Sequence, residues 1–317
     1  MTPLQPAGTG TATHHHGEIL QGACTRAGAL TPCLVTLPVG RAGSTARYTR
    51  TPHGTLQVLP PWKTKAQRAA CLTLELLGQA PAGLLQIESP LATGMGLGSS
   101  SCDVVAAIRA VCAACDRPLS ADRLARIAVQ AEEAVDPIMF DGEVVLFAQR
   151  QGEVLESFGE WIPSFTVLSL DLDPARGGIE TLSLPLPQYT RAELALLESL
   201  IDSLREALRR RDAAAVARVA SASATLNQRY LPMSRFAELW ALAERHGALG
   251  VQISHSGTLA GILFDPRDTL DNEVVARASA DLPALGLRPL GLLVTGAQAP
   301  PLEQAPHPPE PRLRART

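Results

Sequence analysis

The feature that most constrains this chain is the run Gly94-Met-Gly-Leu-Gly-Ser-Ser-Ser101, which leads without a break into the apolar segment 102–110. Alternating glycines leave backbone N–H groups bare and let a polyanion approach the main chain. The helix expected to begin at Ser99 adds the positive end of its dipole at the same place. We therefore predict that this strand-to-helix turn binds phosphate.

Two well-known phosphate loops are excluded by spacing. No Gly-Lys-Ser/Thr follows the glycines, so this is not a Walker loop. The glycines follow a G-x-G-x-G pattern and precede serines, so this is not the dinucleotide fingerprint either. A structural alternative stays open, in which a glycine-rich turn merely ends in a serine that caps the helix.

Composition indicates a soluble globular chain. Its 317 residues suffice for two packed domains or one large domain. A net charge of -3 gives no sign of a nucleic-acid or membrane partner, and no apolar run approaches the roughly 20 residues of a membrane helix. The N-terminus lacks a charged region followed by an apolar core, and the six cysteines lie in apolar contexts, so we expect a cytoplasmic protein with reduced thiols.

The alternation of predicted strands and helices implies an α+β or α/β sandwich. Residues 1–8 and the proline-rich tail 297–317 are expected to be disordered, and Pro163 marks a boundary between domains at 9–160 and 161–296. The expected strands are Cys33–Pro38, Ala46–Arg50, Thr55–Leu59, Leu84–Glu88, Glu143–Ala148, Phe165–Leu170 and Pro289–Val294, with two more flanking residues 254–258. The expected helices are Lys63–Leu77, Ser99–Ala114, Ala121–Ala134, Arg191–Arg210, Ala213–Ala224 and Phe236–His246.

The core of the loop, Gly96–Ser100, resembles the nucleotide loop of the GHMP kinases, the superfamily of galactokinase, homoserine kinase and mevalonate kinase. Two further segments resemble superfamily motifs in the same order. Thr13–Gly22 matches the first motif, in which Gly-Glu lies on a turn beside the acceptor site, and Gly250–Phe264 matches a small-residue loop that closes over the phosphates. The resemblance spans residues 9–296. It implies a GHMP kinase fold, with an N-terminal domain like ribosomal protein S5 and a ferredoxin-like C-terminal domain.

Within the superfamily the chain is most similar to the L-threonine kinases, which make L-threonine O-3-phosphate for the cobalamin side chain. The segments that carry this similarity are Gly17–Gly22, Ser99–Asp103, Glu133–Asp136, Asp171–Asp173, Glu180–Thr181, Leu226–Gln228 and Ser256–Thr258. One departure is His14–His16, where that branch has small residues and a cysteine.

The resemblance implies a kinase that uses ATP and Mg²⁺ to phosphorylate the hydroxyl of a small amino acid, with L-threonine as the first candidate. Homoserine, serine or another hydroxy amino acid are alternative acceptors, and a non-catalytic nucleotide-binding regulator is an alternative function. A lyase-like relative would need a basic pocket, and no lysine lies near the motifs in the sequence. The oligomeric state is open between a monomer and a homodimer.

The resemblance also implies roles for individual residues. Ser100 ligates Mg²⁺ together with a glutamate, either Glu132 or Glu133, although a glutamate pair at a helix end is also typical of a solvated face. Asp136 acts as a base or orients the acceptor hydroxyl, with Asp103 as its rival. The residues expected to bind the nucleotide are Gly94, Gly96, Leu97, Gly98, Ser99, Ser100 and Ser101.

The acceptor site is expected to involve the histidine triplet. Adjacent histidines on an extended strand point to opposite faces, so His14–His16 cannot easily ligate one ion. One or two of them face the acceptor, or else they are exposed on the surface. The residues predicted to bind the acceptor are His16, Glu18, Asp173, Ser256, Gly257 and Thr258. Asn227 and Gln228 serve either this pocket or helix packing.

Overall fold

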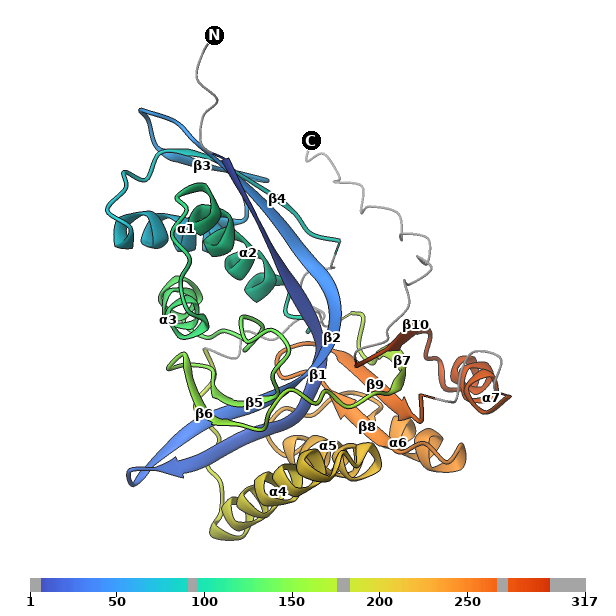
Figure 1. The fold of residues 1–317 in the computed structure, drawn as a ribbon. Helices are drawn as coiled ribbons and strands as arrows, with labels where there is room; N and C mark the ends of the chain where they lie inside the picture. Colours follow the sequence, from blue (N-terminus) through green and yellow to red (C-terminus); the bar gives the residue numbers. More distant parts are fainter. Residues whose placement is uncertain (1–6, 91–95, 176–182, 267–272, 297–317) are drawn as a thin grey trace, which may run out of the picture.

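The computed structural model describes residues 7–90, 96–175, 183–266 and 273–296. Within them the chain forms an α+β fold around one curled sheet, which confirms the predicted class (Figure 1). The strands are β1 (Ala7–Arg26), β2 (Ala29–Arg50), β3 (Leu56–Leu59), β4 (Gly83–Glu88), β5 (Val145–Ala148), β6 (Glu153–Ser157), β7 (Thr166–Asp171), β8 (Gly250–Ile253), β9 (Leu259–Phe264) and β10 (Pro289–Val294). The helices are α1 (Thr64–Leu76), α2 (Ser99–Ala114), α3 (Ala121–Glu132), α4 (Arg191–Arg210), α5 (Ala213–Asn227), α6 (Phe236–Arg245) and α7 (Glu273–Asp281).

The long antiparallel pair β1–β2 runs through the whole molecule and joins its two halves (Figure 1). The sheet order is β10-β7-β9-β8-β1-β2-β4-β3, and β5 pairs with β2 and β6. The halves meet where Glu18 of β1 pairs with Ile253 of β8. The division into domains at residue 160 stays a prediction, and the sheet continues across it.

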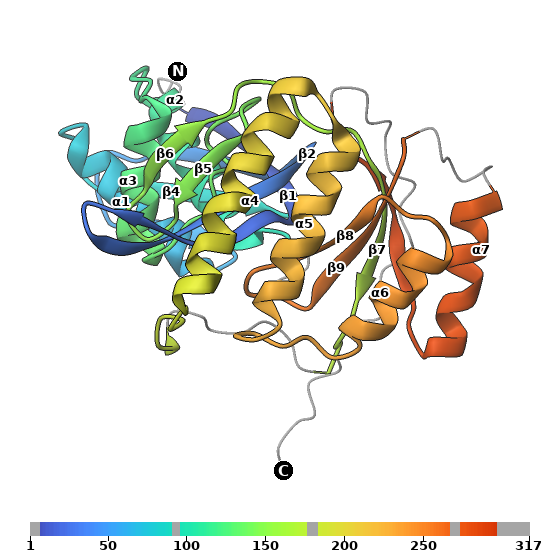
Figure 2. The ribbon, with the colours of Figure 1, turned by 90° about the horizontal axis from the view of Figure 1, so that it is seen from below.

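Helices cover different parts of this sheet. The three helices α1–α3 pack on the part made by β2, β3 and β4 and the first half of β1, around a core that includes Tyr48 and Ile108. The pair α4 and α5 lies side by side over the second half of β1 and the first half of β2, around Leu20 and Leu204 (Figure 2). A third core, with Leu239 and Phe264, lies between β7–β9 and the helices α6 and α7. The phosphate-loop helix α2 and the loop that joins β8 to β9 therefore come from different halves.

Most predicted helices have the expected bounds, because their apolar faces carry a clear 3.6-residue period. The helices α2 and α4 match the predicted residues completely, and α3 ends at Glu132, two residues before the predicted Ala134. Among the described residues, no helix combines the length and apolarity needed to cross a bilayer.

Several expectations about strands and ends are wrong. The two strands expected at Cys33–Pro38 and Ala46–Arg50 are one continuous strand, β2, and Ala7 and Gly8 begin β1 although they were expected to be disordered. Residues 13–22 also belong to β1, a strand hidden by its glycine, threonine and histidine content, which shows no apolar alternation. The short elements β6 and α7 were not predicted. The tail 297–317 and residues 1–6 lie outside the described residues.

The packing of α4 on β1 generates a stability prediction. Leu204 is completely buried between α4 and the sheet, whereas Leu196 on the same helix is 43% exposed. Leu204→Ala is expected to lower the free energy of unfolding by about 2–5 kcal/mol, because it leaves a cavity in a close-packed core. Leu196→Ala is the matched control, with an expected loss below about 1 kcal/mol. Urea denaturation of both variants measures the difference, and equal losses would contradict this account of the core.

Candidate active site

A bulge in β1 arranges the first part of the site. The register of β1 against β2 shifts repeatedly between Ala12 and Leu20, and Gly17 has a φ of +60°, which favours glycine. In a regular strand, side chains three positions apart point to opposite faces. The bulge at Gly17 breaks this alternation, and His15 and Glu18 come to lie on the same side of the strand.

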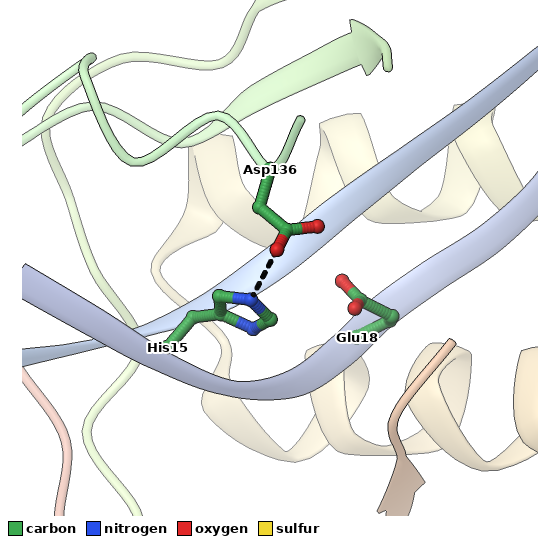
Figure 3. A group of neighbouring side chains, drawn as sticks. All are labelled: His15, Glu18 and Asp136. Atoms are coloured by element: carbon green, nitrogen blue, oxygen red, sulfur yellow. Dashed lines mark ion pairs between the residues drawn. The ribbon is translucent and has the colours of Figure 1, made fainter. Parts of the chain in front are cut away.

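His15, Glu18 and Asp136 point toward one another (Figure 3). The first two come from β1, and Asp136 comes from the segment after α3. The His15 Nε2 atom lies 3.0 Å from Asp136 Oδ2, and each of the three side chains offers an atom within 4.8 Å of the others. The Nδ1 atom of His15 lies 3.3 Å from the carbonyl oxygen of Gly17, which orients the ring. Glu18 accepts a hydrogen bond from the backbone N–H of His255, and its Oε2 atom is buried with no partner among the described residues.

The protonation states in this cluster follow from burial and mutual attraction. Burial alone would lower the pKa of His15, but the Asp136 carboxylate outweighs it and raises the pKa to about 9. Burial opposes ionisation of Asp136, yet the charge of His15 keeps the pKa of Asp136 below its usual range. Burial raises the pKa of Glu18 to about 8. At neutral pH the cluster therefore holds an imidazolium, the Asp136 carboxylate and a neutral Glu18, with no net charge.

The described part of the phosphate loop reaches this cluster directly. Gly98 precedes α2 with a φ of +68°, and a Cβ atom there would lie 2.5 Å from His15 Nε2 and 3.2 Å from Asp136 Oδ2. A side chain at this position would fill the space between the loop and the ion pair. Gly96 approaches Ser254 and Gly257 of the β8–β9 loop just as closely. The structure thus brings together the glycine-rich loop, the first motif and the third motif, although Gly94 lies outside the described residues.

Glu132 is held by two serines of the loop. Its carboxylate accepts hydrogen bonds from Ser100 Oγ at 2.6 Å and from Ser101 Oγ at 2.9 Å. Ser101 Oγ also accepts a hydrogen bond from the backbone N–H of Asp136 at 3.2 Å, so this hydroxyl connects the two carboxylates. Burial raises the pKa of Glu132 to about 7. The neighbouring Glu133 ends α3 in the left-handed region, and its side chain is exposed.

All three histidines of the triplet are buried, so the alternative of surface exposure is wrong. The neighbours His15 and His16 point to opposite faces, as expected for a strand. The Nε2 atom of His16 lies 2.8 Å from Ser169 Oγ on β7, and its Nδ1 contacts the side-chain amide of Gln252 on β8. Burial lowers the pKa of His16 to about 3, so the ring is neutral. His16 was predicted to bind the acceptor, but both of its ring nitrogens are used inside the protein, and His15 is the histidine beside Asp136.

Lys63 contacts the phosphate-loop helix α2 and Lys65 lies near Glu132 of α3, which corrects the inference that no lysine lies near the motifs. Lys63 forms a largely buried ion pair with Asp103, which also accepts a hydrogen bond from Ser44 Oγ at 2.8 Å. Asp103, considered above as a rival to Asp136, is thus occupied by these two partners. Lys65 lies close enough to Glu132 to favour its ionised form. Lys63 and Asp103 are 40 positions apart, so their ion pair could not be recognised in the sequence.

The remaining predicted residues lie on both sides of the site. Ser256, Gly257 and Thr258 lie in the β8–β9 loop, and Gly257 faces Gly96. Asp173 instead accepts a hydrogen bond from Ser234 Oγ at 2.9 Å. Asn227, at the end of α5, lines a cavity with His255, whereas Gln228 hydrogen bonds to the backbone of Ala224 and Met233. The sequence did not indicate Lys63 or His255, and it left open which histidines of the triplet face the acceptor, although only His16 was named for this role.

The comparisons with known proteins identify two family domains and a common fold. Residues 64–140 match the N-terminal domain of the GHMP kinases, and residues 204–280 match their C-terminal domain. The homoserine kinase from Cytophaga hutchinsonii superimposes with a TM-score of 0.67 at 14% identity, covering 94% of this chain and 97% of that one. The mevalonate kinase of L. major, solved with R-mevalonate, gives a TM-score of 0.61 at 15% identity and covers 93% and 99%. The mevalonate kinase of Methanococcus jannaschii gives 0.58 at 14% identity and covers 94% and 100%. None of the curated proteins matches the sequence.

The charge state of the cluster generates a prediction about pH. Glu18 and His15 both have folded-state pKa values above their unfolded ones, so their contributions to stability are present at low pH and lost as pH rises. We expect the free energy of unfolding to fall from about pH 4.5 to pH 8 through Glu18 and from about pH 6.5 to pH 9 through His15. Glu18→Gln should flatten this decline, because the amide cannot ionise. Urea denaturation across this pH range measures the free energy of unfolding of the parent protein and of Glu18→Gln. If this free energy falls equally steeply with pH in both, Glu18 is not buried as a neutral acid.

Proposed function

Because this chain belongs to the GHMP kinase superfamily and is therefore a phosphotransferase with a hydroxyl acceptor, we propose that it phosphorylates the side-chain hydroxyl of a small amino acid from ATP. L-threonine is the first candidate for this acceptor. The observation that carries the proposal is the position of the Asp136 carboxylate beside Gly98 at the start of α2. A carboxylate next to a phosphate loop can accept a hydrogen bond from the hydroxyl that attacks the γ-phosphoryl group.

The loop supports nucleotide binding through its backbone. Gly96 and Gly98 leave no room for side chains, and the N-terminus of α2 directs unpaired N–H groups and a positive dipole end toward the same space. Gly257 of the third motif closes the opposite side. In phosphoryl transfer most of the catalysis comes from positioning and charge stabilisation, which such a cradle supplies.

The donor set near Ser100 fits a magnesium ion. Its hydroxyl and the Glu132 carboxylate are oxygen ligands of the kind that Mg²⁺ prefers, and they already lie in contact. Burial holds the pKa of Glu132 at about 7, and a cation would favour the ionised form of this acid. Of the two glutamates considered, Glu132 is supported by its contact with Ser100, whereas Glu133 is exposed. When bound, Mg²⁺ would neutralise charge on the phosphates.

Asp136 and its partners support the acceptor end of the reaction. The imidazolium of His15 keeps Asp136 ionised, so the carboxylate is ready to accept a hydrogen bond from the acceptor hydroxyl. A low pKa makes Asp136 better suited to orienting the hydroxyl than to retaining its proton. Glu18 completes this pocket next to the loop. Homoserine, serine and other hydroxy amino acids remain alternative acceptors, since one carbon is worth only about 1–3 kcal/mol of discrimination.

The proposal is tested by ADP release and product mass with Mg·ATP and a panel of L-threonine, L-serine and L-homoserine. Phosphorylation of L-threonine is expected, and Asp136→Asn should lower kcat about 10²–10⁴-fold with little change in the KM for ATP. Asp202→Asn, an exposed aspartate on α4, is the control and should retain full activity. Full activity of Asp136→Asn would remove Asp136 from the mechanism, and silence on the whole panel would favour a nucleotide-binding regulator.

The matched variants Glu132→Gln and Glu133→Gln test which of the two glutamates binds Mg²⁺. Removing one charge from a magnesium ligand should raise the Mg²⁺ concentration for half-maximal activity on the order of 10–100-fold. We expect this in Glu132→Gln only, because Glu133 does not contact Ser100. A magnesium titration of both variants with saturating ATP provides the measurement, and equal midpoints would contradict the assignment to Glu132.

A further inference from the structure

A cavity of about 420 Å³ opens beside the Asp136 cluster, on the side away from the described part of the phosphate loop. It lies between the second half of the β1–β2 pair, the segment 184–189 before α4, and the residues after α5. Ala134 contributes to its wall two residues before Asp136. None of the described loop residues 96–101 lines it, so this space is separate from the proposed phosphate site.

His255 connects the cavity to the catalytic cluster. Its ring lines the cavity and hydrogen bonds to Gln21 Oε1 at 3.0 Å, and its backbone N–H donates to the Glu18 carboxylate. His255 is also close enough to Asp136 for the two charges to interact. One wall of the cavity is therefore formed by the residue that hydrogen bonds to Glu18.

Gln149 lines the cavity and holds a buried hydrogen-bond acceptor. Its backbone carbonyl holds the N–H of Val135 at 3.0 Å, which fixes the residue next to Asp136. Its side chain is only 5% exposed, and its Oε1 atom has no hydrogen-bond partner among the described residues. A buried carbonyl oxygen without a partner is costly, so a ligand N–H or O–H that reaches this atom would relieve that cost.

The opposite wall is apolar and aromatic. Leu30, Leu184 and Leu186 line the cavity, and each is more than a third exposed, which is unusual for leucine in this chain. Tyr189 and Tyr230 meet edge to face with ring centroids 4.7 Å apart, and the Tyr230 hydroxyl donates to Glu193 at 3.0 Å. These contacts hold the aromatic wall in place, and the exposed leucines would be covered by an apolar ligand group.

From this cavity we infer that the site, besides phosphorylating L-threonine, prefers a larger hydroxy amino acid: this acceptor carries an aromatic or branched aliphatic group that occupies the cavity while its polar part meets Gln149 and Asp136. The inference rests on the proposed function and specifies its substrate class. Pockets of about 300–1,000 Å³ bury drug-sized molecules. The methyl group of threonine is too small to fill a cavity of this size. With threonine bound, Leu30, Leu184 and Leu186 would stay exposed to water.

The test compares L-threonine with threo-3-phenyl-L-serine, which replaces the methyl group by a ring, and with L-threonine benzylamide, which carries a ring at the carboxyl end. We expect at least one ring-bearing acceptor to exceed L-threonine about tenfold or more in kcat/KM. Leu186→Ser should reduce this preference, whereas Leu196→Ser, an equally exposed leucine on α4 outside the cavity, should not. A preference for L-threonine, or a ratio unaffected by Leu186→Ser, overturns the inference and leaves the proposed kinase function intact.

Thermal unfolding with the same three compounds gives a readout that does not need turnover. The preferred ring-bearing compound should raise the Tm more than L-threonine does. Gln149→Met should weaken that shift without lowering the Tm of the free protein, since it removes an unpaired buried oxygen. Equal shifts by all compounds overturn the inference. If no compound is phosphorylated, the proposed function fails, while the thermal shifts still decide whether the cavity binds an apolar group.

Discussion

The left-handed conformation of Gly17 is the constraint on which the rest of the site depends. It adds a bulge to β1 at the point where that strand passes from one half of the molecule to the other, between its pairing with β2 and its contact with β8. His15 and Glu18 are thereby turned to one side, while His16 is turned to the other and bonded to Ser169 and Gln252. A Cβ atom on residue 17 would collide with the side chain of Gln252, so the same glycine serves both the geometry of the bulge and the packing behind it.

The site combines two carboxylates with opposite electrostatic surroundings. Asp136 faces an imidazolium and stays ionised, whereas Glu132 is buried among serine hydroxyls and stays close to half-protonated at neutral pH. Ser101 connects them through one hydroxyl, so a change in charge on Glu132 is felt at the backbone of Asp136. This arrangement suits a reaction in which a bound cation and a polarised hydroxyl must act at the same time. The neutral sum of His15, Asp136 and Glu18 also limits the cost of burying them together.

Local signals in the sequence were enough for the helices and for the phosphate loop. The bounds of α4 follow from a strong apolar period, whereas α2 is apolar on nearly all sides and is bounded by the loop Gly96–Ser100, which carries its own backbone chemistry. What could not be predicted depends on contacts between distant residues. Nothing local indicates that Lys63 pairs with Asp103, or that Glu132 and not Glu133 faces Ser100. His16 was predicted to bind the acceptor together with Glu18, but the bulge at Gly17 places His15 on the side of Glu18.

The strand β1 is also the first part of this fold to leave the ribosome, and its last partner, β8, is made more than two hundred residues later. Domains made early in synthesis fold as units before later parts exist. Here β1 can pair with β2 as soon as both strands are made. The imidazole of His16 has its hydrogen-bond partners only after Ser169 and Gln252 are synthesised. The burial of this neutral ring is complete only when β7 and β8 have packed against it. The cluster of His15, Glu18 and Asp136 on the other face of the same bulge likewise gains its contact with His255 only after the second half of the chain is made, so an unfinished chain lacks this part of the candidate site.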